Sequence, residues 1–370
     1  MMYSILHTEW SNGWGGQEIR ILEECRGMAA RGHRVELAGC PQGKLRPRAE
    51  AAGLLFHPLS MAGPWDLAAL WRLTRLIKER GMQVVHTHSS VDSWLGGAAA
   101  RLAGAVGVRC RHLSVPVSNH PLNVVYRLPQ AVITTGQGIR RHLIEDYGLP
   151  AARVTSIPTG VDTARFAPAP PDPALLSELG LEAGQPVVAV VAVLRSWKRH
   201  DLFCQMARQV LQERPRTRFL IVGDGPGRAR VAGYLDAMDL RPGVIMTGHR
   251  EDIERILTLC AVCVLVSDKA EGVSQAVLQE LAMERAVVAS RAGDLPEVVR
   301  HEQTGLLVTP GELEPLTQAV LRLLDDQDLR QRLGRAGRRM VLEAYSREHM
   351  LRATEEVYAR ALAGRPGGGA

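Results

Sequence analysis

VCVLVSDKAEGVSQAVLQELAMERAVVAS, residues 262–290, contains a complete strand, loop, helix and strand in that order. Apolar runs at 262–266 and 286–290 are short enough for buried strands, and the apolar residues between them recur at helical spacing. A strand that returns to the same sheet through a helix is the repeating unit of parallel sheets covered by helices. The segment therefore predicts an α/β fold.

The same alternation extends over most of the chain, and a proline-rich stretch at 168–173 divides it. Two doubly wound domains in succession explain this pattern, with the prolines as a linker. In such sheets, ligands bind beyond the carboxyl ends of the strands. Strands are expected at 3–7, 34–38, 84–88, 108–112 and 131–134, and then at 187–193, 219–222, 244–247, 262–266 and 286–290.

The expected domains are an N-terminal acceptor-binding domain, 1–165, and a C-terminal donor-binding domain, 166–345. Residues 314–345 read as helical. A last amphipathic helix, 346–362, is expected to pack back on the N-terminal domain, and the glycine-rich residues 363–370 are expected to form a disordered tail.

Length and composition exclude several classes of protein. The chain has 370 residues, of which 46% are hydrophobic, so it can bury two cores. Its apolar runs are far shorter than the roughly 20 residues of a membrane helix, and its start lacks the pattern of an export signal. We therefore expect a cytoplasmic protein with six free cysteines, of which Cys260 and Cys263 have a structural role.

The net charge of +6 is unevenly distributed. Residues 1–170 carry 19 basic and 12 acidic side chains, whereas residues 171–370 carry 26 and 27. This asymmetry favours an anionic partner for the N-terminal half. Aromatic residues are only 4% of the chain, and no RNA-binding signature accompanies the charge, so nucleic acid is not expected.

Two glycine-containing loops follow predicted strands. Residues 11–18, SNGWGGQE, open a helix whose amides could hold a phosphate, but the spacing is not that of a dinucleotide-binding loop. The second loop starts at Gly223. Arg195 and Lys198 follow the strand at 187–193, where fixed cations could neutralise a departing diphosphate.

The most specific pattern is SDKAEGVSQAVLQELAM, residues 267–283. It resembles the glutamate signature of the retaining, GT-B-type glycosyltransferases of family 4, in which two glutamates separated by seven residues bracket a nucleotide-sugar. Glu271 matches the first glutamate, and Gln279 occupies the second position. An amide can still hydrogen-bond ribose hydroxyls, whereas Glu280 should point elsewhere on the helix.

Further motifs of this family follow in order along nearly the whole chain. They are the double glycine at 15–16, the strand entry at 31–35, the histidine-rich strand end at 85–88, the linker motif at 157–162 and the loop at 292–298. The resemblance implies two facing Rossmann-like domains with a cleft between them. It also implies metal-independent transfer of a sugar, with retention of configuration, from a nucleoside-diphosphate donor and without a cofactor.

The resemblance also implies roles for individual residues. Glu271, His112 and Lys198 would be catalytic. Val193 stands where the family has an arginine, so Arg195 is the proposed substitute, and Arg199 replaces a family glycine and adds positive charge. The expected donor-binding residues are Gly15, Gly16, Arg195, Lys198, Gly223, His249, Arg250, Glu271, Gly272, Val273, Ser274, Gln275 and Gln279.

His86 and His88 have the spacing of two metal ligands on one strand face, but no third ligand follows them in the sequence. We therefore expect no metal site and assign these histidines to the core or the acceptor cleft.

The basic half is where the family binds acceptors, which favours an anionic glycan or glycolipid such as a lipopolysaccharide core intermediate. Residues 109–116 and 131–139 resemble bacterial cell-envelope members of the family. Peripheral contact with the anionic inner membrane, through basic residues and Trp65 or Trp94, is a further expectation.

Three alternatives are weighed against the transferase. A sugar-nucleotide epimerase of the same architecture would need acid and base groups but no acceptor. A non-catalytic module that binds a nucleotide-sugar or a glycan is compatible with Gln279 and Val193. A nicotinamide-dependent oxidoreductase lacks its fingerprint.

Overall fold

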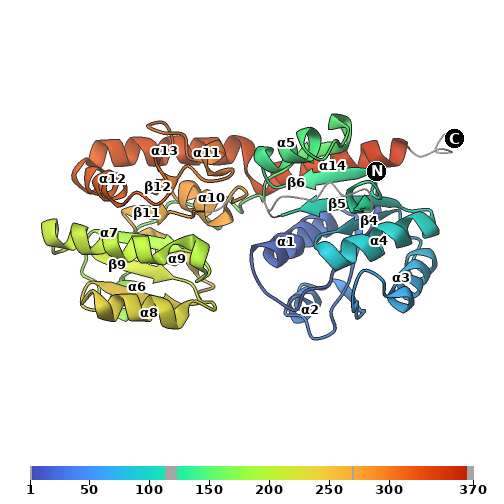
Figure 1. Ribbon diagram of the computed structural model, residues 1–370, viewed down its shortest axis with the longest axis horizontal. Helices are drawn as coiled ribbons and strands as arrows, with labels where there is room; N and C mark the ends of the chain where they lie inside the picture. The colour runs from blue at the N-terminus through green and yellow to red at the C-terminus, as the bar shows by residue number, and fades with distance from the viewer. Residues whose placement is uncertain (1, 113–122, 269–270, 365–370) are drawn as a thin grey trace. The chain divides into compact units, whose positions relative to one another are not determined.

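The computed structural model describes residues 2–112, 123–268 and 271–364. It divides into two compact units (Figure 1). Unit 1 comprises the chain up to Gly160 together with the segment from Arg347 onward, and unit 2 comprises Val161–Ser346. The boundary thus lies after Gly160 and not after residue 165, because Val161 already pairs with Ser346 and Phe166 belongs to the core of unit 2.

A parallel sheet forms the centre of unit 1. Its strands are β1 (Ser4–Glu9), β2 (Arg34–Gly39), β3 (Leu55–Pro58), β4 (Val84–Thr87), β5 (Val106–Arg111), β6 (Ala131–Thr134) and β7 (Val154–Ser156). They lie in the order β3-β2-β1-β4-β5-β6-β7. The order reverses between β1 and β4, so the loops that follow these two strands meet at the carboxyl edge of the sheet.

Helices cover this sheet where the sequence provides caps and an apolar stripe. In α3, for example, the Asp66 carboxylate accepts from the amide of Ala69, and Ala69, Leu73 and Ile77 form the buried stripe. The helices of unit 1 are α1 (Gly16–Ala30), α2 (Leu45–Ala51), α3 (Leu67–Glu79), α4 (Ser90–Ala103), α5 (Gln137–Glu145) and α14 (Arg347–Ala363), with short 3-10 turns η1 (Val124–Tyr126) and η2 (Ala151–Arg153).

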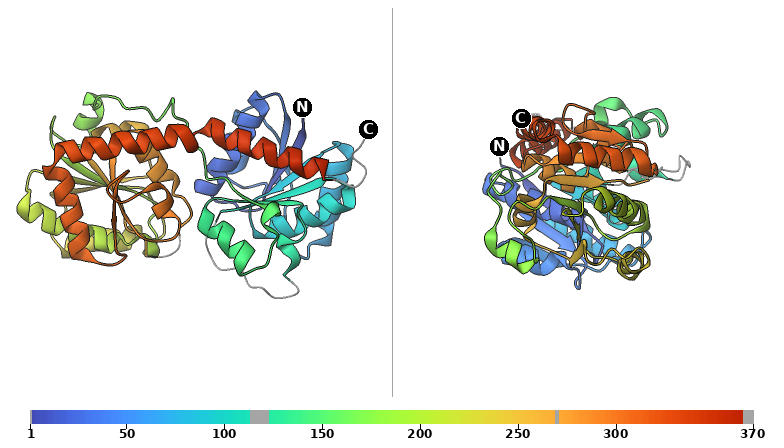
Figure 2. Two further views of the ribbon diagram at one scale, coloured as in Figure 1. Left: turned by 90° about the horizontal axis from the view of Figure 1, so that it is seen from above. Right: turned by 90° about the vertical axis from the view of Figure 1, so that its left-hand side faces the viewer.

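The last helix, α14, belongs to unit 1 and lies beside α1 and β5 (Figure 2). Gly27 on α1 permits this close approach, because a Cβ there would lie 2.4 Å from Leu351 Cδ1. The helix extends to Ala363, so the expected tail begins later than predicted, and residues 365–370 lie outside the described residues.

Unit 2 repeats the architecture with a sheet that is buried on both faces. Along its first strand, Val187 and Ala189 enter one core cluster, whereas Val188 and Val190 enter the other. The strands are β8 (Val187–Val191), β9 (Arg218–Val222), β10 (Val244–Gly248), β11 (Val262–Leu265), β12 (Ala286–Ser290) and β13 (Leu306–Val308). Their order is β10-β9-β8-β11-β12-β13, so the reversal lies between β8 and β11.

The helices of unit 2 differ from the sequence expectation at one place. The stretch expected to be helical over 314–345 forms two helices, because Asp326 ends the first and its carboxylate caps the second by accepting from the amide of Leu329. The helices are α6 (Pro173–Glu178), α7 (His200–Glu213), α8 (Arg228–Ala237), α9 (Ile253–Leu259), α10 (Gln275–Ala282), α11 (Leu295–Val298), α12 (Leu313–Asp325) and α13 (Gln327–Ala344), with the 3-10 turn η3 (Ser196–Lys198).

The predicted fold class is confirmed: both units are doubly wound, Rossmann-like parallel sheets. Three short strands, β3, β7 and β13, were not predicted from the sequence, because runs of three or four residues give little periodic signal. All six cysteines are free, as predicted. Among the described residues, none of the helices combines the length and the apolar character needed to cross a bilayer.

Candidate active site

Two loops of unit 2 meet where its strand order reverses. β8 leads to Lys198 at the end of η3, and β11 leads to Glu271 ahead of α10. Lys198 Nζ lies 2.8 Å from Glu271 Oε1, and each side chain is 15% exposed. A cation and a carboxylate are thus held together at the edge of the sheet where doubly wound folds bind ligands.

The backbone around Glu271 is fixed by a glycine. Gly293 has φ +54°, and a Cβ there would lie 2.1 Å from the Glu271 carbonyl oxygen. The amide of Asp294 donates to that same oxygen at 2.8 Å. On the other side, the amide of Asp268 donates to the carbonyl of Trp197, next to Lys198, at 3.0 Å. The 292–298 loop therefore acts as a support that positions Glu271.

The glycine turn after β9 packs against the segment that precedes η3. A Cβ on Gly223, whose φ is +144°, would lie 2.0 Å from the carbonyl oxygen of Ala192. The amide of Gly227 donates to the Leu194 carbonyl at 2.8 Å. The glycines thus allow two backbones to approach closely, and a donor contact by Gly223 stays a prediction.

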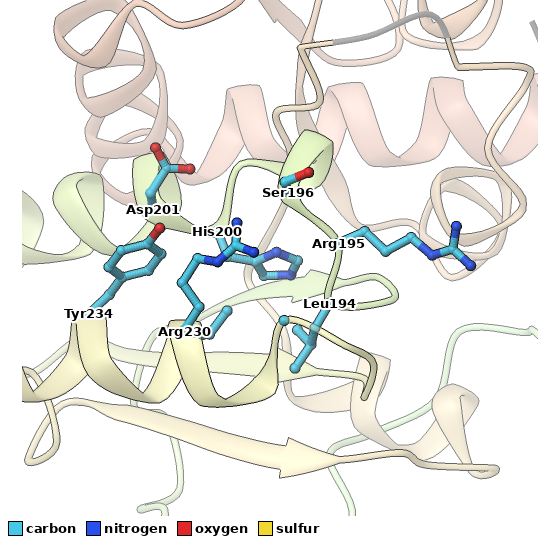
Figure 3. Close-up of a pocket in the computed structure, with 9 residues that line it drawn as sticks. Leu194, Arg195, Ser196, His200, Asp201, Arg230 and Tyr234 are labelled. Carbon is cyan, nitrogen blue, oxygen red and sulfur yellow. The ribbon is translucent and has the colours of Figure 1, made fainter. Parts of the chain in front are cut away.

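Arg195 lies beside a hollow of about 30 Å³, a volume too small for a nucleotide. Its guanidinium extends away from His200 and Arg230 (Figure 3) and lies over the Trp197 ring, 5.0 Å from the centroid. The side chain is exposed. The proposed substitution of Arg195 for the family arginine stays a prediction.

Arg199 adds less free charge than the sequence suggested. It has φ +51°, the left-handed conformation that glycine adopts most easily. Its guanidinium is bound by the Asp201 carboxylate, with Nε to Oδ1 at 3.0 Å and Nη2 to Oδ2 at 2.9 Å. The expected additional positive charge is therefore neutralised by a neighbour two residues away.

In unit 1, the glycine loop after β1 already holds a carboxylate of the protein itself. The amide of Gly15 donates to Glu18 Oε2 at 2.8 Å, and Ser11 Oγ donates to Glu18 Oε1 at 2.6 Å. Glu18 thus occupies the start of α1, where a helix attracts anions. The amide of Gly15 is therefore bound by the protein's own carboxylate, and the donor contacts of Gly15 and Gly16 stay predictions.

Four histidines form a cluster at the carboxyl edge of the same sheet. His7 Nδ1 lies 2.9 Å from His88 Nε2, and His88 Nδ1 lies 3.3 Å from His112 Nε2. His86 Nδ1 contacts the Tyr358 hydroxyl at 2.7 Å. Burial lowers the pKa of His7 to about 3 and also lowers the pKa values of His88 and His112. At neutral pH these three rings are therefore neutral hydrogen-bonding groups.

The expectation that His86 and His88 have no third partner of metal-binding type is wrong. β1 and β4 pair in register and place His7 opposite His86. One ring nitrogen from each of the three histidines lies within 4.8 Å of the others, and His88, Cys110 and His112 form a second such group. These are donors that transition metals accept.

The charges around the cluster oppose a divalent cation, however. Arg20 is fully buried, and its Nε lies 3.6 Å from Glu24 Oε2. Glu24 Oε1 also lies 3.1 Å from His86 Nδ1. A dication would add buried positive charge beside a carboxylate that already serves two partners. The arrangement favours neutral, mutually hydrogen-bonded rings.

Comparison with known proteins identifies the family. Residues 14–165 match the family model described as Glycosyltransferase Family 4, and residues 185–326 match the model described as Glycosyl transferases group 1. The chain belongs to the family 4 glycosyltransferases.

This glycosyltransferase resembles several known proteins over most of its length. It is 29% identical over 282 residues, 71% of this chain and 72% of the relative, to the UDP-Gal:alpha-D-GlcNAc-diphosphoundecaprenol alpha-1,3-galactosyltransferase of Escherichia coli. Its fold is similar to a glycosyltransferase from Rickettsia africae, with TM-score 0.88, 20% identity and coverage of 98% and 100% of the two chains. It is also similar to Anabaena HepE solved with UDP-glucose, with TM-score 0.85, 19% identity and coverage of 96% and 99%.

The departures of the glycosyltransferase from its family motif can now be placed. Gln279 is half-buried, whereas Glu280, the next residue on α10, is directed into the core and 1% exposed. Val273 is buried, and α10 begins at Gln275, so residues 272–275 lead into the helix N-terminus as predicted. Their amide contacts to a donor stay predictions.

Arg250, expected to bind the donor, has two carboxylate partners in this glycosyltransferase. Asp252 and Glu178 both bind its guanidinium, and these hydrogen bonds raise the pKa of Arg250. Glu178 lies far away in sequence, so this neutralisation was not visible there. His249, next to it, is exposed beyond the end of β10.

Glu280 gives a pH-dependent prediction. Burial raises the pKa of Glu280 from 4.5 to about 8, and its Oε2 atom has no hydrogen-bond partner among the described residues. The folded state therefore holds a proton that the unfolded state releases above about pH 4.5, so folding stability falls as the pH rises toward 8. Glu280→Gln imitates the protonated acid.

We expect the melting temperature of Glu280→Gln to exceed that of the wild type by at least about 3 °C at pH 8.5 and by much less at pH 5. Thermal unfolding at both pH values measures this difference. A difference that does not change with pH would mean that Glu280 is already ionised in the fold.

Proposed function

We propose that this protein transfers a sugar from a nucleoside-diphosphate donor to a glycan or glycolipid acceptor in cell-envelope synthesis, with retention of configuration and without a metal. The observation that carries the proposal is the Lys198–Glu271 pair at the carboxyl edge of the donor-side sheet. Membership of the family supports the general activity. The known activity of the Escherichia coli relative and the UDP-glucose bound to HepE support the class of donor.

The proposed reaction depends on stabilisation of the negative charge that develops on the leaving group. The bond between the anomeric carbon and the donor phosphate breaks, and negative charge collects on the departing diphosphate. Lys198 lies where it can offset that charge, because a fixed cation stabilises developing negative charge without reorganisation. Glu271, which forms an ion pair with Lys198, would exchange this partner for sugar hydroxyls. Gln279 would hold the ribose and Gly16 would offer an amide to the diphosphate.

The acceptor hydroxyl forms the new bond to the anomeric carbon on the face that the phosphate leaves. Its proton passes to the departing phosphate oxygen, so no protein nucleophile is required. His112 would contact the sugar near the anomeric centre. Its neutral ring can accept or donate a hydrogen bond, and the contact to His88 orients it.

Product analysis tests this reaction against its alternatives. The purified protein is incubated with a nucleoside-diphosphate sugar, a lipid-diphosphate-linked sugar acceptor and EDTA. Equal amounts of free nucleoside diphosphate and glycosylated lipid, with the donor's anomeric configuration by NMR, are expected. Conversion of the donor sugar without nucleotide release would favour an epimerase. Donor binding without either product would favour a binding module, and inverted product would contradict retention.

We further propose an anionic acceptor attached to a lipid, with a lipopolysaccharide intermediate as the specific case. The excess of basic residues in the first 170 positions supports this choice. The Escherichia coli relative acts on a sugar linked to diphosphoundecaprenol, which has the same chemistry. The resemblance of residues 109–116 and 131–139 to bacterial cell-envelope members of the family supports it as well. Of these residues, 113–116 lie outside the part of the chain that the structure describes.

A face of unit 1 suits peripheral contact with an anionic membrane. Trp65, Leu67 and Trp71 lie at the start of α3 and are 85%, 73% and 62% exposed. Of the two tryptophans that the sequence offered as alternatives, Trp94 is half-buried and stacks on Trp65 with the ring centres 6.4 Å apart, so Trp65 is the better candidate. The exposed basic residues on the same helix are Arg72, Arg75 and Lys78. Exposed tryptophan beside basic side chains is typical of interfacial helices.

Replacing Trp65, Leu67 and Trp71 together by serine is expected to lower retention on phosphatidylglycerol-containing vesicles at physiological salt by about tenfold. Leu102→Ser with Leu342→Ser, which also removes exposed apolar side chains, is the control and should leave retention unchanged. Co-sedimentation measures both. Absence of wild-type retention, or equal loss in the control, would remove the membrane proposal.

A further inference from the structure

Unit 1 contains a basic pocket at the edge of its sheet opposite to the histidine cluster. A pocket of about 300 Å³ is lined by Arg101, Arg127, Arg153 and Arg360. Arg127 lies shortly before β6, and Arg153 directly precedes β7, so the pocket is at the amino edge of these strands. The histidine cluster lies at their carboxyl edge. The pocket is therefore separate from the candidate active site.

The pocket concentrates positive charge without a counter-ion. None of the residues that line it is acidic. Within residues 2–112, 123–268 and 271–364, no carboxylate forms an ion pair with any of the four arginines. Burial, and then the charge of Arg101, lower the pKa of Arg153. An anion in the pocket would relieve this repulsion.

Two of the arginines are held rigidly by the backbone turn that precedes β6. Arg101 Nε donates to the Leu128 carbonyl at 3.1 Å. Arg153 Nε donates to the Gln130 carbonyl at 3.3 Å, and its Nη2 donates to the Pro129 carbonyl. These contacts give Arg101 and Arg153 a structural role. They also fix the two guanidinium groups in place, which lowers the entropy cost of binding a ligand.

The side chains of the other two arginines, Arg127 and Arg360, make other contacts and are not held by that turn. Arg360 Nη2 donates to Thr155 Oγ1 at 3.4 Å, and the Arg127 guanidinium lies 5.9 Å from the centre of the Tyr147 ring. Both side chains are exposed. Stabilisation of the turn therefore accounts for two of the four positive charges and leaves Arg127 and Arg360 available to a ligand.

We propose that this arginine pocket binds a phosphate group, either of a small soluble phosphate or of a lipid headgroup. Guanidinium groups match phosphate oxygens in geometry and charge. The volume lies at the lower limit for ligand pockets, which favours a compact phosphate over a nucleotide-sugar. The inference does not depend on the proposed transferase activity, because it involves none of the residues assigned to the donor.

The test compares two double variants with the same change in charge. Arg127→Gln with Arg360→Gln removes the two available arginines, whereas Arg141→Gln with Arg352→Gln removes two exposed arginines elsewhere in unit 1. All proteins carry Lys198→Ala, so that the proposed donor site does not bind the probe. Pyrophosphate and inorganic phosphate are titrated by calorimetry, and vesicles containing phosphatidylglycerol are titrated by co-sedimentation.

We expect the pocket variant to weaken binding by at least tenfold relative to the control variant for one class of probe. Loss of pyrophosphate or phosphate binding identifies a soluble ligand, and loss of vesicle binding alone identifies a lipid headgroup. Both variants keep the exposed side chains of α3, so any vesicle binding through α3 is the same in both, and only the difference between the variants reports the pocket. Equal binding by the two variants to every probe, or no binding by the parent, would overturn the proposal. Thermal unfolding confirms that both variants fold.

Discussion

Replacing Lys198 by alanine should lower kcat/KM for sugar transfer by about 10²–10³-fold, the usual consequence of losing one group that stabilises developing negative charge. Lys198 is the cation that unit 2 places beside Glu271, with Nζ 2.8 Å from Oε1. Arg199 and Arg250 are neutralised by carboxylates, which leaves Arg195 as the next candidate after Lys198. The diphosphate would therefore leave without its main counter-charge.

Arg216→Ala is a suitable control for this prediction, because Arg216 is an exposed cation of the same unit with a side chain that is 77% exposed. It should keep wild-type kcat/KM. Steady-state release of nucleoside diphosphate measures both variants. If Lys198→Ala retained activity within a few-fold of the wild type, the leaving group would be stabilised elsewhere, and Arg195 would be the next residue to test.

Replacing Glu24 by glutamine should destabilise unit 1 by about 3–5 kcal/mol, because it leaves a buried cation without its partner. Glu24, Arg20 and His86 are all 0% exposed. Arg20 Nη1 donates to the Ile157 carbonyl at 2.7 Å, so the guanidinium cannot withdraw to solvent without losing a further contact. Glutamine keeps the shape of the side chain but not its charge.

The neighbouring variant Glu23→Gln provides the control. Glu23 also pairs with two arginines, Arg26 on α1 and Arg347 on α14, but its side chain is 27% exposed, so its loss should cost less than about 1 kcal/mol. Hydrogen exchange of the β1 and β4 amides at increasing urea measures the stability of unit 1 separately from that of unit 2. Equal effects of the two variants would show that the buried pair does not stabilise the unit.

The Glu24 effect should also depend on pH with a defined sign. Burial raises the pKa of Glu24, but His86 and Arg20 lower it more strongly, so the pKa lies below its ordinary value of 4.5. A lowered pKa stabilises the fold above the unfolded value, and this contribution is lost as the pH falls below it. The difference between wild type and Glu24→Gln should therefore shrink below about pH 4.5.

The sequence predicted those parts of the structure that depend on short-range pattern. Lys198 and Glu271 each follow a long apolar run, and the topology of doubly wound sheets brings the ends of such runs together. The start of the helix after Glu271 was also predicted from local pattern, because its apolar residues recur at helical spacing. The ion pair between Lys198 and Glu271 was not predicted, because the position of Glu271 depends on contacts with residues such as Gly293 in another loop.

The parts that the sequence did not predict depend on contacts between distant segments. His7 joins His86 only through the register of β1 and β4, and a single histidine in a strand carries no signal of its own. Tyr358 and Glu24 reach the same cluster from α14 and α1. Glu178 on α6, which pairs with Arg250, is equally distant from it in the sequence.

Saturation-transfer NMR with a panel of nucleoside-diphosphate sugars in EDTA tests the central claim most directly. One donor is expected to show saturation of its sugar and ribose protons with the wild type, and this signal should disappear in Lys198→Ala and Glu271→Ala. No signal from any donor, or an undiminished signal in both variants, would contradict the assignment of Lys198 and Glu271 as the donor site.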